Sequence, residues 1–210
     1  MTTHYHTAIA SGAAATAATF NVPLAALDAQ IKTNTDALSA YTSAMESVES
    51  GKATAVVSIA GIVRQSTLTL TLTVDNKITL ADGADHGAGV KVYTFPAGRI
   101  LVLGAVINCT TEIEGASGGA ATVDLAVGTV TAADDATLTS TEANIIPSTA
   151  TDNGASTWKA ALGASAQFDG TSTAVALYVN AGVTDAISAS AVTVVISGTL
   201  TVTWINLGDY

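Results

Sequence analysis

Residues 66–74 have the sequence Ser-Thr-Leu-Thr-Leu-Thr-Leu-Thr-Val, in which threonine alternates with an aliphatic residue over the length of a strand. Side chains of a β-strand point alternately to the two faces of its sheet, so this spacing predicts a strand with three leucines and Val74 on one face. Asp75-Asn76 is a turn signal. Residues 77–80, Lys-Ile-Thr-Leu, are therefore predicted to return as the second strand of a hairpin.

Further stretches of the chain have the apolar, β-branched character of strands, and loops rich in Gly, Asp and Ser separate them. They are residues 53–63, 90–95, 100–109, 121–127, 174–180 and 191–205, the last interrupted near Gly198. The connection 128–168 is predicted to cross the barrel or to form an external flap, with a short helix at 157–162. Eight or nine strands without a helix between them indicate a mainly β fold, an antiparallel β-sandwich or jelly roll.

A different period precedes this β domain. From Pro23 onward, residues recur at alternating spacings of three and four, which is the pattern of a heptad helix. The core positions of the heptads are Leu24, Leu27, Ile31, Asn34, Leu38, Tyr41, Met45 and Val48. Residues 1–20 have no sustained period and are predicted to form an extended arm. The chain thus divides into an arm (1–20), an oligomerisation or attachment helix (21–51) and a β-sandwich domain (52–210).

The apolar stripe of the predicted helix is narrow, because its flanking positions are mostly Lys, Asp, Ser and Thr. A helix that packs on its own domain usually has a wider apolar face, so the narrow stripe favours a bundle between subunits. Asn34 at a core position would fix the register and restrict the number of partners. We expect a homotrimer held by these eight positions. The alternative is a helix that packs back on its own domain.

Composition excludes several classes of protein. Of the 210 residues, 49% are hydrophobic and 11% are charged, and the net charge is −10. A chain this apolar is not intrinsically disordered, and one with so few Lys and Arg is not expected to bind nucleic acid. It has no apolar run long enough for a transmembrane helix and no secretory signal pattern. The single cysteine fits a chain made in a reducing cytoplasm.

Five groups of residues are candidates for chemical sites. Gly115-Ala-Ser-Gly-Gly119 matches the G-x-S-x-G nucleophile motif, but no histidine follows it to complete a triad. His4 and His6 could meet at a threefold axis and bind a metal, although a mobile arm would not orient them. His86 beside Asp82 and Asp85, and the pair Asp134-Asp135, are interpreted as solvated loops. Cys109 is expected to be buried and inert. The sequence therefore predicts no enzyme, no cofactor and no metal site.

Two parts of the sequence resemble known virion proteins. Residues 19–28, Thr-Phe-Asn-Val-Pro-Leu-Ala-Ala-Leu-Asp, run into the heptad helix and resemble the N-terminal attachment region of phage fibre and head-decoration proteins. Residues 95–102, Phe-Pro-Ala-Gly-Arg-Ile-Leu-Val, together with 123–129 and 143–148, are similar to β-domains of tailed-phage virion structural proteins. The resemblance implies a virion component without a catalytic signature.

On this resemblance we expect a trimeric capsid decoration or cement protein that is made in the host cytoplasm and sits on the capsid surface. Its partners would be its own copies and the major capsid protein or another virion component, with no nucleic acid and no membrane. The alternative is a tail or head fibre protein whose β domain binds a host-surface glycan. Trp158, Trp204, Phe95, Phe168 and Tyr178 are interpreted first as core or interface anchors. Those that are exposed beside Asp or Asn would serve the glycan-binding role.

Overall fold

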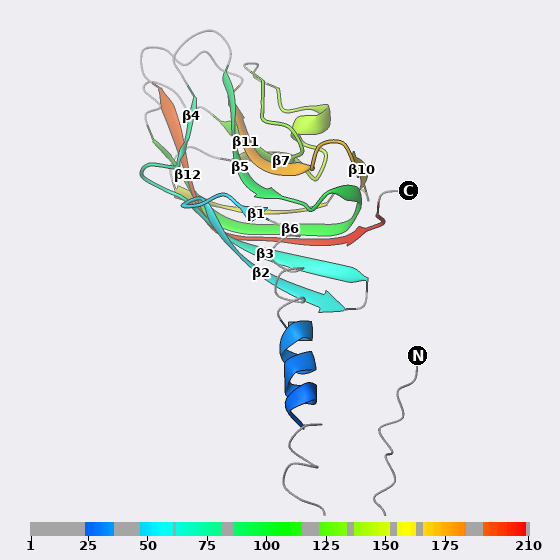
Figure 1. Ribbon diagram of the computed structural model, residues 1–210. Helices are drawn as coiled ribbons and strands as arrows, with labels where there is room; N and C mark the ends of the chain where they lie inside the picture. Colours follow the sequence, from blue (N-terminus) through cyan, green and yellow to red (C-terminus); the bar gives the residue numbers. More distant parts are fainter. Residues whose placement is uncertain are drawn as a thin grey trace, which may run out of the picture. The chain divides into compact units, whose positions relative to one another are not determined.

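The computed structural model describes residues 24–35, 47–60, 62–80, 86–114, 122–133, 137–151, 155–162, 166–183 and 191–208. The chain separates into two compact units, Met1–Ala44 and Met45–Tyr210. The first unit contains a helix over residues 24–35, and the second contains the described strands. Figure 1 shows these strands as two layers. The predicted mainly β fold, a sandwich of two antiparallel sheets, is confirmed.

The smaller sheet has the order β1-β5-β11-β7-β8. Its strands are β1 (Ser47–Val48), β5 (His86–Thr94), β11 (Ala176–Val183), β7 (Val123–Gly128) and β8 (Ile146–Thr151). Just after β1, the carboxylate of Glu49 pairs with the ammonium group of Lys91 on β5 at 2.6 Å. This hydrogen bond and the negative charge of Glu49 raise the pKa of Lys91. The ion pair thus attaches the start of the β domain to β5.

The larger sheet has the order β10-β6-β12-β3-β2, with β4 beside β12 and β9 beside β6. Its strands are β2 (Ala53–Ala60), β3 (Val63–Leu72), β4 (Ile78–Leu80), β6 (Gly98–Glu114), β9 (Ala155–Ala161), β10 (Ala166–Gly170) and β12 (Val192–Asn206). β3 and β4 both run antiparallel to β12, one after the other. β9 and β10 follow one another along β6 in the same way. The seven strands therefore form five rows.

The core lies between the two sheets and follows the predicted alternation. Leu68, Leu70 and Leu72 of β3 are fully buried, and the threonines between them face outward. Trp204 of β12 lies at the centre of a polar and aromatic cluster, where its Nε1–H donates to the hydroxyl of Ser66 at 3.0 Å. Phe95 contacts the Trp204 ring edge to face at 5.2 Å between centroids. Apolar packing and an internally paired polar group thus coexist in this core.

The predicted hairpin after residue 74 is wrong. Residues 73–77 loop out of the sheet, and the chain then continues in its original direction as β4. The pairing of Leu72 with Ile196 and of Ile78 with Val194 shows that the loop spans only two positions of β12. Val74 does not face the core, because it lies in this loop with φ 45° and is 76% exposed. The turn signal at Asp75-Asn76 therefore marks a loop inserted between two strands that lie end to end beside β12.

Three other predicted elements also differ from the structure. Residues 53–63 form two strands and not one, since the chain reverses so that Ala60 pairs with Val63. The predicted helix at 157–162 is instead β9. The predicted break near Gly198 is absent, because β12 continues through this residue and pairs with β3 and β6 on its two sides. A Cβ at Gly198 would lie 2.4 Å from the Asn108 carbonyl oxygen, so glycine permits a close approach of backbones.

A loop covers part of the outer face of the smaller sheet, and we call residues 129–133 and 137–145 the outer loop. It includes a short 3-10 turn, η1 (Ser140–Glu142), which lies beside β7 and β11 (Figure 1). Asn180 of β11 is fully buried beneath the loop. Its side-chain oxygen accepts from the Ala132 N–H at 3.0 Å, and its amide donates to two loop carbonyls at 2.9 and 2.7 Å. The predicted flap thus exists in part, since the rest of 128–168 belongs to both sheets.

Candidate functional site

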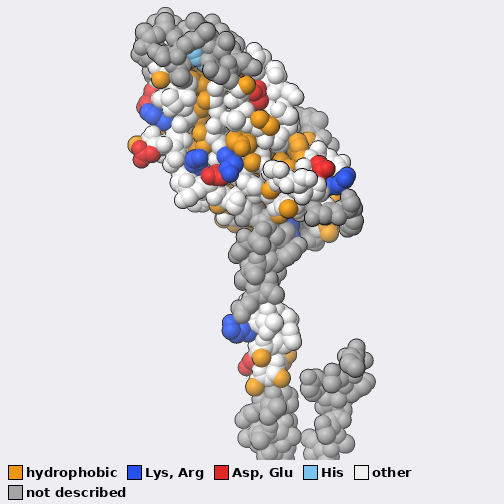
Figure 2. Space-filling model, turned by 45° about the horizontal axis from the view of Figure 1, so that its top comes forward, with side chains coloured by type: hydrophobic (Ala, Val, Ile, Leu, Met, Phe, Trp, Pro, Cys, Tyr) orange, Lys and Arg blue, Asp and Glu red, His pale blue; other side chains and the backbone are white. Residues whose placement is uncertain are grey.

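The helix of the first unit has an apolar stripe on its surface. Leu24, Leu27 and Ile31 are 57%, 58% and 54% exposed, and Figure 2 shows hydrophobic side chains on the surface of this helix. Asn34, the fourth predicted core position, lies on the same helix and accepts a hydrogen bond from Gln30 at 2.9 Å. The first four positions of the predicted stripe are therefore helical, and the three apolar ones are available for contact.

The remaining four predicted positions differ in their outcome. Leu38, Tyr41 and Met45 lie outside the described residues. Val48 belongs to β1, where it pairs with Tyr93 of β5, so its prediction as a helical core position is wrong. The helix cannot extend to Gly51, because the hydrogen bonds of β1 require an extended backbone at residues 47 and 48. The boundary between the two units accordingly lies before Met45.

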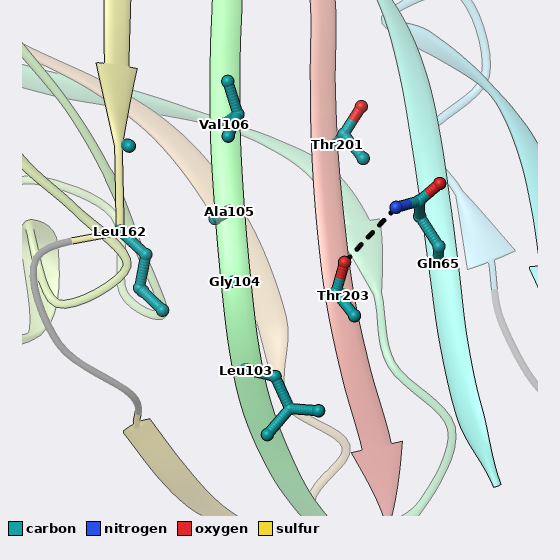
Figure 3. A pocket seen from close by; sticks show the side chains of 9 residues that line it. Gln65, Leu103, Gly104, Ala105, Val106, Leu162, Thr201 and Thr203 are labelled. Carbon is teal, nitrogen blue, oxygen red and sulfur yellow. Dashed lines mark hydrogen bonds between the residues drawn. The ribbon is translucent and has the colours of Figure 1, made fainter.

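A shallow groove of about 620 Å³ crosses the outer face of the larger sheet. Figure 3 shows its walls, which come from β3, β6, β12 and the end of β9. The lining residues are Gln65, Leu103, Gly104, Ala105, Val106, Ala161, Leu162, Thr201 and Thr203. The amide of Gln65 donates to the Thr203 hydroxyl at 3.4 Å across its floor. None of the lining residues is ionisable, so the groove offers apolar contacts and neutral hydrogen-bonding groups but no acid, base or activated nucleophile.

A β-bulge builds the apolar side of this groove. The pairing of β6 with β12 shifts by one residue between Thr203 and Trp204, which leaves Leu103 without an opposite residue. Bulges change the direction of side chains, and here Leu103 is placed outward beside Val106. The sequence prediction missed this site because its residues come from four separate strands. A usable signal was the unbroken apolar run from Ile100 to Leu103, which departs from strict alternation.

A second depression has aromatic and carboxylate groups in its lining. Phe168 and Tyr178 are both partly exposed there, and Asp169 lies beside them. The Asp169 carboxylate accepts from the hydroxyl and the backbone N–H of Thr171, at 2.7 and 3.1 Å. These hydrogen bonds lower the pKa of Asp169, so the group is a charged acceptor at neutral pH. The other three aromatic candidates, Trp158, Trp204 and Phe95, are buried and cannot contact a ligand at the surface.

Of the residues named as chemical candidates, the structure describes His86 and Cys109. The interpretation of His86 as part of a solvated loop is wrong, because its side chain is buried at the start of β5. His4, His6, residues 82–85, residues 115–119 and Asp134-Asp135 lie outside the described residues. In the described ranges, no three His, Cys, Asp or Glu side chains are close enough to bind a metal ion together. No helix in the described part of the chain is long and apolar enough to cross a membrane.

Cys109 of β6 is buried, as predicted, and burial raises the pKa of its thiol to about 11. Because of this higher pKa, the buried thiol carries only about one hundredth of the thiolate of an unperturbed cysteine. Only the thiolate is alkylated rapidly. At pH 8 the folded protein is therefore expected to react with iodoacetamide at least about a hundredfold more slowly than the urea-unfolded chain. Mass spectrometry of quenched samples measures both rates. Native and unfolded rates within threefold of each other would contradict this burial.

Comparison of the chain with protein-family models, with curated proteins and with solved structures finds no match. No family is assigned on that basis. The features that bear on function are therefore the exposed stripe of the helix and the uncharged groove of the larger sheet. Both are exposed on the described part of the chain.

Proposed function

We propose that this chain is a non-enzymatic structural protein that forms trimers through its N-terminal helix and displays the β-sandwich as a head. The observation that carries the proposal is the row formed by Leu24, Leu27 and Ile31, each more than half exposed on one chain. Apolar residues at heptad spacing are buried when helices associate, and this burial stabilises the assembly. Asn34, one heptad after Leu27, supplies the polar core position that limits register and partner number.

The proposed biological role is decoration of a phage capsid, with trimers bound at threefold or quasi-threefold positions. A protein that binds the assembled shell and not its free subunits shifts the equilibrium toward the intact particle. The head suits this role because the groove of its larger sheet has no charged lining. Broad, uncharged contacts that symmetry repeats can be weak one at a time and strong together.

The trimer is tested by placing charges on the stripe. In the double variant Leu27→Asp/Ile31→Asp, two carboxylates would have to be buried at the helix contact, which strongly opposes association. At low protein concentration, light scattering is expected to give three times the 20.8 kDa chain mass for the native protein and no trimer for the variant. The far-UV spectrum of the β domain is expected to stay unchanged.

The matched control is Ala29→Asp/Thr33→Asp, which adds the same charge to the same helix away from the stripe. This variant is expected to remain trimeric. A native protein that is monomeric at every concentration would contradict the proposal, and so would dissociation by the control variant to the same extent.

The virion role is tested with capsid shells that lack the protein. Native trimers are expected to co-sediment with the shells and to raise the temperature at which filled particles rupture, whereas the stripe variant is expected to lose both effects. If the trimers bind no shell, the decoration role would be contradicted and the trimer alone would remain.

The alternative function is glycan binding by a fibre head, and the depression at Phe168 and Tyr178 is the observation that favours it. Partly exposed rings beside a charged acceptor, Asp169, are the groups that bind sugars. A glycan array with native protein and with Tyr178→Ala separates the two functions. Binding that the Tyr178 substitution abolishes would support the fibre role.

A further inference from the structure

The free edges of the two sheets differ in how they are protected. An unpaired edge strand exposes N–H and C=O groups to other chains, and proteins usually block it with short strands, charges, proline or bulges. In the described part of the smaller sheet, β1 has only two residues, and β8 contains Pro147 and pairs with β7 through an irregular register. At one edge of the larger sheet, Lys159 and Asp169 place charges on β9 and β10.

The opposite edge of the larger sheet, β2, has none of these protections. Its sequence over residues 53–60 is Ala-Thr-Ala-Val-Val-Ser-Ile-Ala, with no charge and no proline. The register with β3 runs without a bulge from Ala53 to Ala60. Among the described strands, β2 has a neighbour on its β3 side only. A long, neutral, regular edge is the kind to which another strand adds.

The hydrogen bonds of β2 identify the groups that are open. The N–H of Thr71 donates to the Lys52 carbonyl at 2.8 Å, which places residue 52 in a hydrogen-bonded pair with β3. In an antiparallel ladder such residues alternate, so positions 54, 56 and 58 also bond to β3. Positions 55, 57 and 59 then direct their backbone groups to the open edge. Consistent with this alternation, the Ala53 N–H donates away from β3, to the Glu49 carbonyl.

We propose that β2 pairs antiparallel with β2 of a second copy of this chain, about a twofold axis through Val56. In this register Ala55 lies opposite Val57 of the second copy, and the two open residues exchange both of their backbone hydrogen bonds. The larger sheets of the two copies then join into one continuous sheet. The contact uses no residue of the helix, so it is separate from the proposed trimer.

The sequence of β2 selects a second copy as the occupant because it is nearly symmetrical about Val56. On the outer face, Val56 lies opposite Val56 of the second copy, and Thr54 lies opposite Ser58 of the second copy. Pairs of β-branched residues and pairs of hydroxyl residues both stabilise antiparallel strands. Val56 is 74% exposed in one chain, so its side chain is available for this pair. A twofold axis through Val57 would instead place Val56 opposite Ser58 and lose both matched pairs.

A cysteine at position 56 tests the pairing. Opposite residues at a non-hydrogen-bonded position have Cα atoms about 4.5 Å apart, which is within the range of a disulfide. The variant Val56→Cys is therefore expected to form a covalent dimer under mild oxidation. In Thr54→Cys, the matched control, the two cysteines would be about 14 Å apart along the joined strands, four residues at roughly 3.4 Å each. Cys109 does not interfere, because it is buried.

The experiment is carried out on the full chain with the native helix and again with Leu27→Asp/Ile31→Asp. Non-reducing gels are expected to show at least tenfold more dimer for Val56→Cys than for Thr54→Cys in both backgrounds. Dimer formation in the stripe variant would establish the β2 contact even if the helix proposal failed. Equal dimer yields at the two positions, or no dimer at either position, would overturn the proposal. It would also be overturned if β2 of a monomeric chain paired with a strand of a different protein.

A charge at the axis provides an independent measurement. Val56→Lys would bring two ammonium groups together at the twofold axis and is expected to weaken the dimerisation measured by sedimentation at least tenfold. Val74→Lys is the control, because Val74 is 76% exposed and lies in the loop 73–77, outside the β2 positions 54–58 that would pair. An unchanged dimerisation constant for Val56→Lys would contradict the assigned register.

Discussion

Replacement of Trp204 by alanine is expected to lower the free energy of unfolding of the β domain by about 4 kcal/mol, the range typical of a fully buried tryptophan. The side chain has no solvent exposure and contacts Phe95 edge to face. Its removal leaves a cavity and takes the indole donor from Ser66. The Arg64 guanidinium, 5.4 Å from the ring centroid, also loses this aromatic contact. Urea denaturation followed by circular dichroism measures the loss.

Leu207→Ala is the control for Trp204, because this leucine lies three residues further along the chain and is 37% exposed. It is expected to change stability by less than about 1 kcal/mol, since surface substitutions usually have small effects. A loss below about 1 kcal/mol for Trp204→Ala itself would show that the cluster is not the tightly packed centre described above.

Replacement of Asn180 by leucine is expected to cost about 3 kcal/mol or more, because each buried polar group that loses its partner costs about 1–3 kcal/mol. The substitution would leave three backbone groups without their partner, the N–H of Ala132 and the carbonyls of Val130 and Glu142. The outer loop would detach from β11 before the sandwich unfolds. Hydrogen exchange of the loop amides is the direct measurement, and the Ala132 amide is expected to lose its protection.

Asn180→Asp separates hydrogen bonding from packing. A carboxylate can still accept from the Ala132 N–H but cannot donate to the two carbonyls, so this variant is expected to be destabilised as well. Asn108→Ala is the control, because Asn108 is exposed on β6. Full amide protection in Asn180→Leu would show that the loop is held by its other hydrogen bonds to the sheet, among them the one that the Thr131 hydroxyl donates to the Gly89 carbonyl of β5.

Local periodicity predicted the faces of strands but not their partners. The leucines at 68, 70 and 72 are buried as the alternation requires. The direction of the chain after Asp75-Asn76 depends on β12, more than a hundred residues later, so a local turn signal could not show that the row continues. Residues 157–162 have helix-forming alanines and a lysine, yet the pairing of Trp158 with Cys109 determines an extended conformation there. Tertiary pairing outweighed local propensity in both cases.

The candidate surfaces were predictable to different extents. The stripe at Leu24, Leu27 and Ile31 follows from spacing alone, because all three lie on one helix. Val48 has the same spacing, but its pairing with β5 depends on a strand that the heptad pattern does not contain. The groove depends on a bulge at Leu103, and a bulge is defined only by the register between two strands. Asn180 was not predicted, although one asparagine in an apolar strand is a signal of a buried polar contact.

The position of β12 determines when this domain can fold. It is synthesised after every other strand of the larger sheet, yet it occupies the middle row, between β3 and β6. Until residues 192–206 leave the ribosome, β3 and β6 have no partner on the sides that face each other. Strands exposed in this way during synthesis favour aggregation. A nascent chain that is arrested before residue 192 is therefore expected to need a chaperone or to precipitate, and the completed chain is expected to fold in one late step.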